Sequence, residues 1–228
     1  DGLLLGLLLP LHTPIGILVI AVFMTVFVGR YFYPKRTFFT PSLIGILSAF
    51  GCSIWFSLCE FSKASVIRLL FEYTEWTSTS SMSLSSLWLG FVGEWISKTS
   101  PILCFFALCY LIFKKAIPWR IPIYFIGSSF LLFLWYHFFI PITLIDIAKW
   151  FGTGNILFLA IFVATDRRTV PVTDSGQILF AIFLAFGTYY GSFYLTSFLA
   201  MIISLLILNL FTPLFDYFGN YYGLKYCS

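Results

Sequence analysis

Apolar stretches separated by short polar connections run through most of the chain. A helix that crosses a bilayer needs about 20 predominantly apolar residues, and several of these stretches approach that length with their flanks. Gly187 and Gly191 interrupt one of them. We therefore expect helices, most of them membrane-spanning, over residues 15–28, 41–58, 101–113, 121–140, 178–195 and 198–214.

One apolar run is too short to cross a bilayer. It covers residues 156–164 and stops at Thr165 and Asp166, which Arg167 and Arg168 follow. Such a run reaches only about half way through the hydrocarbon core. A half-length apolar helix that ends in polar chain, set among longer helices, is typical of a re-entrant or discontinuous membrane helix.

A second short run suggests an internal repeat. Residues 3–11 form this run, which prolines close, and two longer apolar runs follow it. The same order, one short run and then two longer ones, occurs in residues 3–58 and again in residues 156–214. Repeats built around half-helices occur in many transporters and channels, where the functional path lies between the half-helices near the membrane midplane.

The polar segments mark the connections between these helices. Residues 59–86 form the one extended polar region, and residues 87–96 are expected to rest at the membrane interface. Residues 141–150 are expected to be a connector. Ser100 and Pro101 are typical of a helix start, with Ser100 as the capping residue and Pro101 at the first helical position.

Composition excludes a soluble globular domain. Sixty per cent of the 228 residues are hydrophobic and only 10% are charged, whereas soluble domains average about 25% charged residues. The chain has room for about six or seven spans in one membrane domain. We therefore predict an all-α polytopic membrane protein that sits in the lipid bilayer.

The basic residues indicate how the chain is oriented. They give a formal net charge of +4 but occur in short clusters between apolar runs, which excludes a nucleic-acid surface and fits the positive-inside rule. We place the clusters Arg30, Lys35, Arg36 and Lys114, Lys115, Arg120 on the cytoplasmic side, and residues 59–86 outside. The prediction is a single transmembrane domain with a first repeat in residues 1–58 and a second in residues 87–228.

Few residues offer chemistry. The five cysteines form no C-x-x-C pair, so buried free thiols are expected rather than metal ligands. Ionisable residues at membrane depth are functional candidates by default, which singles out Asp166; an interfacial charge cluster is the alternative. The Thr165 hydroxyl and the unpaired carbonyls before it can coordinate a cation or a polar solute, or the hydroxyl can cap the freed backbone.

Several motifs together resemble the membrane subunit shared by the Rnf and Na⁺-pumping quinone reductase complexes, which is called RnfD in the former and NqrB in the latter. They occur in the family's order over nearly the whole chain. The motifs are residues 1–10 (DGLLLGLLLP), 39–45 (FTPSLIG), 93–94 (GE) with 99–100 (TS), 119–123 (WRIPI), 163–166 (VATD) with 171–173 (PVT) and 176–177 (GQ), and 208–216 (LNLFTPLFD).

The resemblance implies a fold of two inverted repeats, similar to urea and ammonium channels, and about two further spans before the point where this sequence starts. It also implies FMN, which the family carries on a threonine through a phosphoester. The corresponding segment here is residues 62–69, where Ser62, Ala64 and Ser65 would contact the flavin and Ser65 supplies a hydroxyl. Lys63 and Val66 replace a glycine and a proline of the family pattern, and a polar loop with an incidental serine is the alternative.

Three hypotheses follow for function. The first is a subunit of an electron-transport complex in the bacterial inner membrane, with other membrane subunits as partners, that relays electrons, through flavin if Ser65 carries it, or couples electron flow to ion translocation. The second is a channel or carrier for a small polar solute that uses Thr165 and Asp166. The third is a cofactor-free structural subunit of a membrane assembly.

Overall fold

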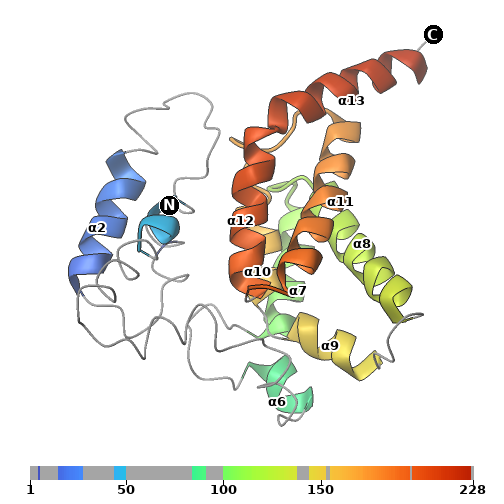
Figure 1. The fold of residues 1–228 in the computed structure, drawn as a ribbon. Helices are drawn as coiled ribbons and strands as arrows, with labels where there is room; N and C mark the ends of the chain where they lie inside the picture. The colour runs from blue at the N-terminus through green and yellow to red at the C-terminus, as the bar shows by residue number, and fades with distance from the viewer. Residues whose placement is uncertain are drawn as a thin grey trace.

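A computed structural model describes residues 5, 15–27, 44–49, 84–90, 100–137, 144–152, 155–195 and 197–226. Within these residues the structure is helical and contains no strand (Figure 1). The helices are α2 (Ile15–Val26), α6 (Leu84–Leu89), α7 (Pro101–Phe113), α8 (Arg120–His137), α9 (Leu144–Gly152), α10 (Asn155–Phe158), the π-helical turn η4 (Leu159–Val163), α11 (Asp174–Gly191), α12 (Ser197–Leu210) and α13 (Thr212–Tyr226). The all-helical part of the fold prediction is confirmed.

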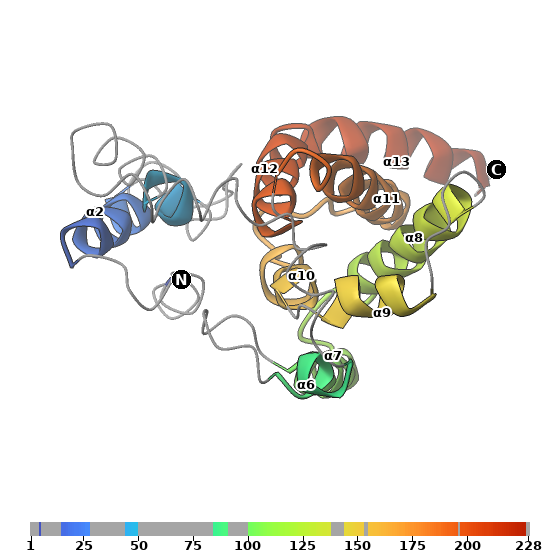
Figure 2. The same cartoon turned by 60° about the horizontal axis from the view of Figure 1, so that its bottom comes forward.

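Helix α11 is the centre of the bundle. It packs against α8, α12 and α13, and its residues Phe180, Ala181, Leu184 and Ala185 are fully buried. Figures 1 and 2 show α8 and α12 on different sides of α11, with α13 laid across one end of the bundle. Helix α2 and the short helix of residues 44–49 stand to one side.

Helices α8 and α11 run side by side in the same direction. The first residue of α8, Arg120, pairs with the first residue of α11, Asp174. Near the other end, the Phe133 ring meets the Tyr189 ring edge to face at a centroid distance of 4.9 Å. Phe133 also meets Trp150 of α9 at 5.0 Å, so an aromatic cluster joins three helices at this end. The cluster adds ring-to-ring attraction to the burial of large apolar area.

Several sequence predictions are confirmed. Helix α7 begins at Pro101 and ends at Phe113, as expected. The short run becomes the buried helix α10–η4, which ends at Val163, two residues before Thr165. Helix α2 covers most of the range predicted for it.

Ser100 occupies the N-cap position of α7, as predicted, but its side chain does not cap the helix. Pro101 does occupy the first turn, but the Ser100 side chain makes no capping hydrogen bond to α7. Its hydroxyl donates instead to the Trp88 carbonyl at 2.8 Å, which ties α7 to the end of α6. A carbonyl at the end of a helix lacks an intrahelical donor, so it is available to accept a hydrogen bond from the serine hydroxyl.

Three helix boundaries also differ from the prediction. Helix α6 begins at Leu84, inside the predicted polar loop. Helix α9, residues 144–152, covers most of the predicted connector 141–150 and extends beyond it, because Ile147, Trp150 and Phe151 recur at helical spacing and are buried on one face. Helix α8 covers Arg120–His137, so its described part is shorter than the predicted span.

The predicted span 178–195 is displaced towards the N-terminus. Helix α11 begins at Asp174, where the Gln177 amide donates to the Thr173 carbonyl, and ends at Gly191. An acidic residue is favoured in a first helical turn, so the polar residues 174–177 belong to the helix. Gly187 does not interrupt it.

The last predicted span, 198–214, breaks at Phe211. Helix α12 ends at Leu210 and α13 begins at Thr212, and the two axes differ by 60°. Pro213 explains the break, because a proline inside a helix removes one hydrogen bond and its ring clashes with the carbonyl four residues earlier.

No single helix among the described residues combines the length and the apolar character that a crossing of the membrane requires. Helix α12 together with α13 as far as Tyr221 meets both requirements as a bent pair. Helices α2, α7 and residues 120–135 of α8 are shorter apolar helices.

The cysteine prediction holds in part. Cys104 and Cys109 are free thiols in α7, but only Cys104 is buried. Their spacing places them on different faces of the helix. Of the other cysteines, Cys52, Cys59 and Cys227 lie outside the described residues.

Small residues set the contact between α11 and α12. A Cβ added to Gly187 would lie 2.6 Å from the Ser204 Oγ, and one added to Gly191 would lie 2.9 Å from the Ala200 Cβ. Each pair of positions is four residues apart on its own helix, so both helices present a flat stripe of small side chains. Such stripes allow close approach of helices in membrane proteins.

The first prediction concerns this contact. We expect Gly187→Ala to lower the free energy of unfolding by about 1–3 kcal/mol, because its methyl group overpacks the interface. Gly127→Ala in α8 is the matched control, since nothing lies within 4 Å of the position that its Cβ would take; there alanine should stabilise the helix by up to about 1 kcal/mol. Thermal unfolding of the purified variants measures both. Equal effects of the two substitutions would contradict close packing, and Gly187→Ala combined with Ser204→Gly should recover most of the loss.

Candidate functional site at the end of the short helix

The short helix α10–η4 is buried along almost its whole length. Leu159, Ala160, Ile161 and Val163 are each at most 2% exposed. The Ala164 amide donates to the Leu159 carbonyl at 2.8 Å, a bond between residues five apart that defines a π-helical turn. Such turns are rare and occur frequently at functional sites.

Thr165 lies directly after this turn and is 3% exposed. Its hydroxyl donates to the Ile161 carbonyl at 2.5 Å, which is the capping contact that the sequence allowed. The last carbonyls of a helix have no intrahelical donors, so this bond satisfies one of them. A threonine oxygen retains lone pairs that can accept a further donor or coordinate a cation.

Asp166 closes the turn that follows. Its main-chain carbonyl accepts the amides of Thr169 at 3.1 Å and Val170 at 3.2 Å. Its carboxylate accepts the amide of Arg168 at 3.1 Å, a local turn that Asp forms readily. The structure therefore uses Asp166 to shape the chain, while its side chain remains partly exposed.

The two arginines after Asp166 are exposed. The Arg167 guanidinium donates to the Lys115 carbonyl at 2.6 Å, which joins this segment to the connection between α7 and α8. Lys115 adopts a φ of 53°, in the left-handed region that usually favours glycine. The basic cluster of residues 114–120 and the basic pair 167–168, which are far apart in the sequence, thus lie at one end of the bundle.

Asp216 of α13 holds the segment that leads into α11. One of its carboxylate oxygens accepts the Val172 amide at 2.7 Å and the Thr173 amide at 3.2 Å. The Thr173 hydroxyl donates to the same oxygen at 3.4 Å. Hydrogen bonds to an ionised acceptor are stronger than neutral ones, so this carboxylate fixes the residues before α11.

Two more side chains hold the loop of residues 164–173, here called the 164–173 loop. The Thr212 hydroxyl donates to the Thr169 carbonyl at 3.0 Å, and the Gln177 amide nitrogen donates to the Pro171 carbonyl at 3.1 Å. The motifs that the sequence presents separately, residues 163–177 and 208–216, therefore meet in space. Asp216 and Gln177 both belong to the motifs quoted above, but their spacing in the sequence did not indicate that they hold the same loop.

The Gln177 side-chain oxygen is the unexplained polar atom of this region. Gln177 is 9% exposed, and this oxygen has no hydrogen-bond partner within the structure described. Buried polar atoms usually have partners or hold water. A carbonyl oxygen beside the 164–173 loop can accept a donor from water or from a solute, or coordinate a small cation.

The structure does not bring all predicted site residues together. Thr165 and Asp166 lie at the 164–173 loop, as described above. The predicted flavin residues Ser62, Ala64 and Ser65 lie outside the described residues.

Comparison with known proteins gives a match over almost the whole chain. The model of the NQR2, RnfD, RnfE family matches residues 1–222. The match includes the 164–173 loop and the residues of α11 and α13 that hold it.

Individual relatives match shorter stretches. A subunit of the proton-translocating ferredoxin:NAD(+) oxidoreductase complex of Clostridium ljungdahlii is 36% identical over 97 residues, which are 42% of this chain and 29% of that protein. A subunit of the ion-translocating oxidoreductase complex of Methanosarcina acetivorans is 33% identical over 106 residues, 46% of this chain and 34% of that protein. The corresponding protein of Halorhodospira halophila is 30% identical over 93 residues, 41% of this chain and 26% of that protein. Each match thus covers about a third of the relative or less.

The second prediction tests the role of Asp216. Asp216→Ala removes the acceptor of two amides, and each lost bond to a charged group costs about 1.5–3 kcal/mol. We expect hydrogen exchange at Val172 and Thr173 to accelerate and the free energy of unfolding to fall by several kcal/mol. Asp174→Ala is the matched control at the same end of the bundle, because the Arg120–Asp174 ion pair, with side chains 29% and 66% exposed, contributes about 0–1 kcal/mol. Unchanged exchange at Val172 in Asp216→Ala would contradict the assigned role.

Proposed function

Because the chain belongs to the NQR2, RnfD, RnfE family, as its motifs predicted, we propose that it is an integral membrane subunit of an ion-translocating oxidoreductase complex. In this role it relays electrons, or couples electron flow to the movement of ions across the bacterial inner membrane. Its partners are the other membrane subunits of the complex.

One observation carries this proposal: the family match extends over residues 1–222, and two family motifs inside it converge on one polar site. The relatives' names describe subunits of ion-translocating oxidoreductase complexes. The low share of charged residues, 10%, favours a lipid environment for the same chain.

The ion path of the proposal passes the end of the short helix. In this proposal, helix α10–η4 extends only part of the way into the membrane. Thr165 and Asp166 lie beside the last carbonyls of this helix, which have no intrahelical donors. Discontinuous helices in transporters use such carbonyls to coordinate ions. The buried Thr165 hydroxyl, the free Gln177 oxygen and the π-helical turn support this placement.

A contact between a glycine and a hydroxyl joins the two long helices in each half of the chain, with the glycine on the second long helix of the first half and on the first long helix of the second half. A Cβ on Gly45 would clash with Thr25 of α2, whose hydroxyl donates to the carbonyl of Ala21, four residues earlier. Gly187 faces Ser204 of α12 in the same way, and that hydroxyl also donates to a carbonyl four residues earlier. Each half of the chain thus contains a helix pair in which a glycine faces a self-bonded hydroxyl.

FMN is the cofactor of the proposal, held as a phosphoester of Ser65. The serine hydroxyl provides the oxygen that this bond requires, and Ser62 and Ala64 flank it in the corresponding segment. When bound, the flavin would accept and donate electrons.

The third prediction tests the cofactor. The complex is purified from its native membranes, the chain is denatured and washed, and flavin fluorescence is measured in the gel. We expect fluorescence from the native chain and from Ser62→Ala, but not from Ser65→Ala. An intact mass equal to that of the unmodified chain would refute covalent attachment of flavin.

The fourth prediction tests the ion path. Thr165→Val removes the hydroxyl at the end of the short helix and should impair ion translocation by the reconstituted complex. Thr188→Val is the matched control, because the Thr188 hydroxyl is also buried and also donates to a carbonyl four residues earlier, Leu184, at 2.7 Å. Both variants should lose about 0.5–1.5 kcal/mol of stability.

The comparison of the two variants separates transport from folding. Equal ion translocation by Thr165→Val and Thr188→Val, measured with a voltage- or ion-sensitive dye, would exclude Thr165 from the path. Solute flux through the isolated chain in vesicles without any redox partner would instead support a channel or carrier.

A further inference from the structure

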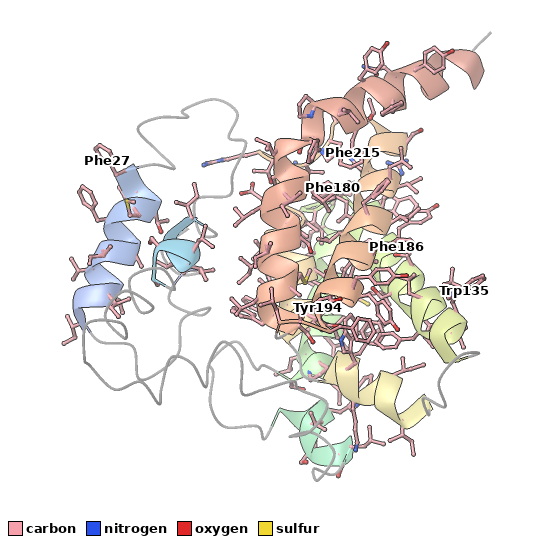
Figure 3. The ribbon with its side chains drawn as sticks, in the orientation of Figure 1. Phe27, Trp135, Phe180, Phe186, Tyr194 and Phe215 are labelled. Carbon is pink, nitrogen blue, oxygen red and sulfur yellow. The ribbon has the colours of Figure 1, made fainter. Side chains whose placement is uncertain are left out.

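Helix α13 has two distinct faces. Thr212, Phe215 and Gly219 are buried and recur at helical spacing. The Phe215 ring contacts Phe180 and Phe183 of α11, so this face packs on the bundle (Figure 3). Gly219 lies so close to Thr173 that a Cβ would clash with it.

The opposite face of α13 is apolar and exposed. Leu214, Tyr217, Phe218 and Tyr221 are 48%, 70%, 42% and 57% exposed. Their spacing of three and four residues places them in one stripe along the helix. Contiguous exposed apolar surface of this kind marks a site of contact with a membrane or another protein.

Cations surround the same end of the bundle. Lys114, Lys115, Arg167 and Arg168 are exposed there, on two connections that the Arg167–Lys115 hydrogen bond holds together. Among the acids of this end, Asp166 accepts the Arg168 amide, Asp174 pairs with Arg120 and Asp216 accepts backbone amides. The four cations therefore present their charge outwards, next to an aromatic helix.

We infer that α13 lies flat in the headgroup region of an anionic lipid bilayer, with its Leu214–Tyr221 stripe towards the acyl chains and the four cations on lipid phosphates. The inference rests on the membrane placement in the proposed function and goes beyond it, because it assigns a lipid-binding surface.

The chemistry of α13 fits this position better than the membrane interior. The helix contains Asp216, Asn220 and Lys225 together with its aromatic stripe, a composition typical of interfacial helices. Tyrosine is enriched at the membrane interface, where its ring is apolar and its hydroxyl remains hydrated. Each lysine or arginine near an anionic surface adds an attraction that extends over about a Debye length.

The geometry of the bundle agrees with this orientation. Helix α13 departs from the direction of α12 by 60°, so it does not continue along the axis of α12. Helix α11, with 18 residues, is about 27 Å long, close to the thickness of a bilayer core. At its far end the exposed side chains of Tyr194 and Trp135 form a second aromatic level (Figure 3).

The test measures the depth of single positions in the reconstituted chain. Single cysteines are introduced at Tyr221, Asn220 and Leu131 in a background whose five cysteines are serine, and each is labelled with a fluorophore. Quenching by lipids brominated near the headgroup is compared with quenching by lipids brominated near the end of the acyl chain. The Tyr221 probe should be quenched mainly by the shallow lipid, because interfacial helices lie about 5–10 Å deep.

The other two positions are controls. Asn220 lies off the stripe, so its probe should be quenched less by either lipid. Leu131 lies in the middle of α8 and is 65% exposed, so its probe should be quenched mainly by the deep lipid. If the Leu131 probe is not quenched at all, the proposed membrane placement fails. If Leu131 is quenched as expected but Tyr221 is either unquenched or deep, only the inference about α13 is overturned.

Charge neutralisation tests the lipid preference. In vesicles of phosphatidylcholine with phosphatidylglycerol, we expect the native chain to enrich the anionic lipid in its bound layer. Each cation that is removed should lower this enrichment by up to about fivefold. The variant measured carries Lys114→Gln and Arg168→Gln together. Lys149→Gln, at the other end of the bundle, is the charge control. Equal enrichment by the double variant and the native chain would overturn the lipid assignment, as would loss of Tyr221 quenching in the assembled complex, where a protein would then cover the stripe.

Discussion

The fold depends on hydrogen-bond partners for the backbone amides and carbonyls at the point where the short helix ends inside the bundle. A helix that stops among apolar neighbours leaves carbonyls without donors, and the chain that follows adds further unpaired groups. Here the Thr165 hydroxyl donates to one of these carbonyls, and the Asp166 carbonyl accepts two amides in the turn that follows. Side chains from α11 and α13 satisfy further backbone groups of the 164–173 loop, namely the amides of Val172 and Thr173 and the carbonyls of Thr169 and Pro171.

This requirement explains why distant segments carry the polar residues that they do. The Asp216 oxygen reaches amides 43 and 44 residues away in the sequence, and Thr212 reaches a carbonyl 43 residues away. Both side chains start from the first turns of α13, so the bend at Pro213 positions them over the loop. The kink, the loop and the start of α11 thus form one unit, in which removal of any polar member leaves another group without a partner.

The sequence predicts elements whose limits are set locally. Pro101 fixes the start of α7, and the change from apolar to charged residues fixes the end of the short helix. Prediction from the sequence fails where contacts between distant helices determine the limits of an element. Residues 174–177 look like loop by their polarity, yet they are helical because Asp216 and Pro171 anchor them. Ser100 is a capping residue by type, but its hydroxyl donates its hydrogen bond to the Trp88 carbonyl of another helix. Helix α9 was missed because its apolar residues form a stripe rather than a continuous run.

The roles of Gly187 and Gly191 also depend on contacts between helices that the sequence alone does not reveal. From the sequence, Gly187 and Gly191 interrupt an apolar run, because glycine is a poor helix former. In the bundle they permit α12 to approach, since Ser204 and Ala200 occupy the space that their side chains would need. The close approach brings α12 to the side of α11 and leaves the end of α11 for Phe215 and Gly219 of α13. The position of α13 then follows from its own contacts at the start of α11, where Phe215 packs on Phe180 and Gly219 lies against Thr173.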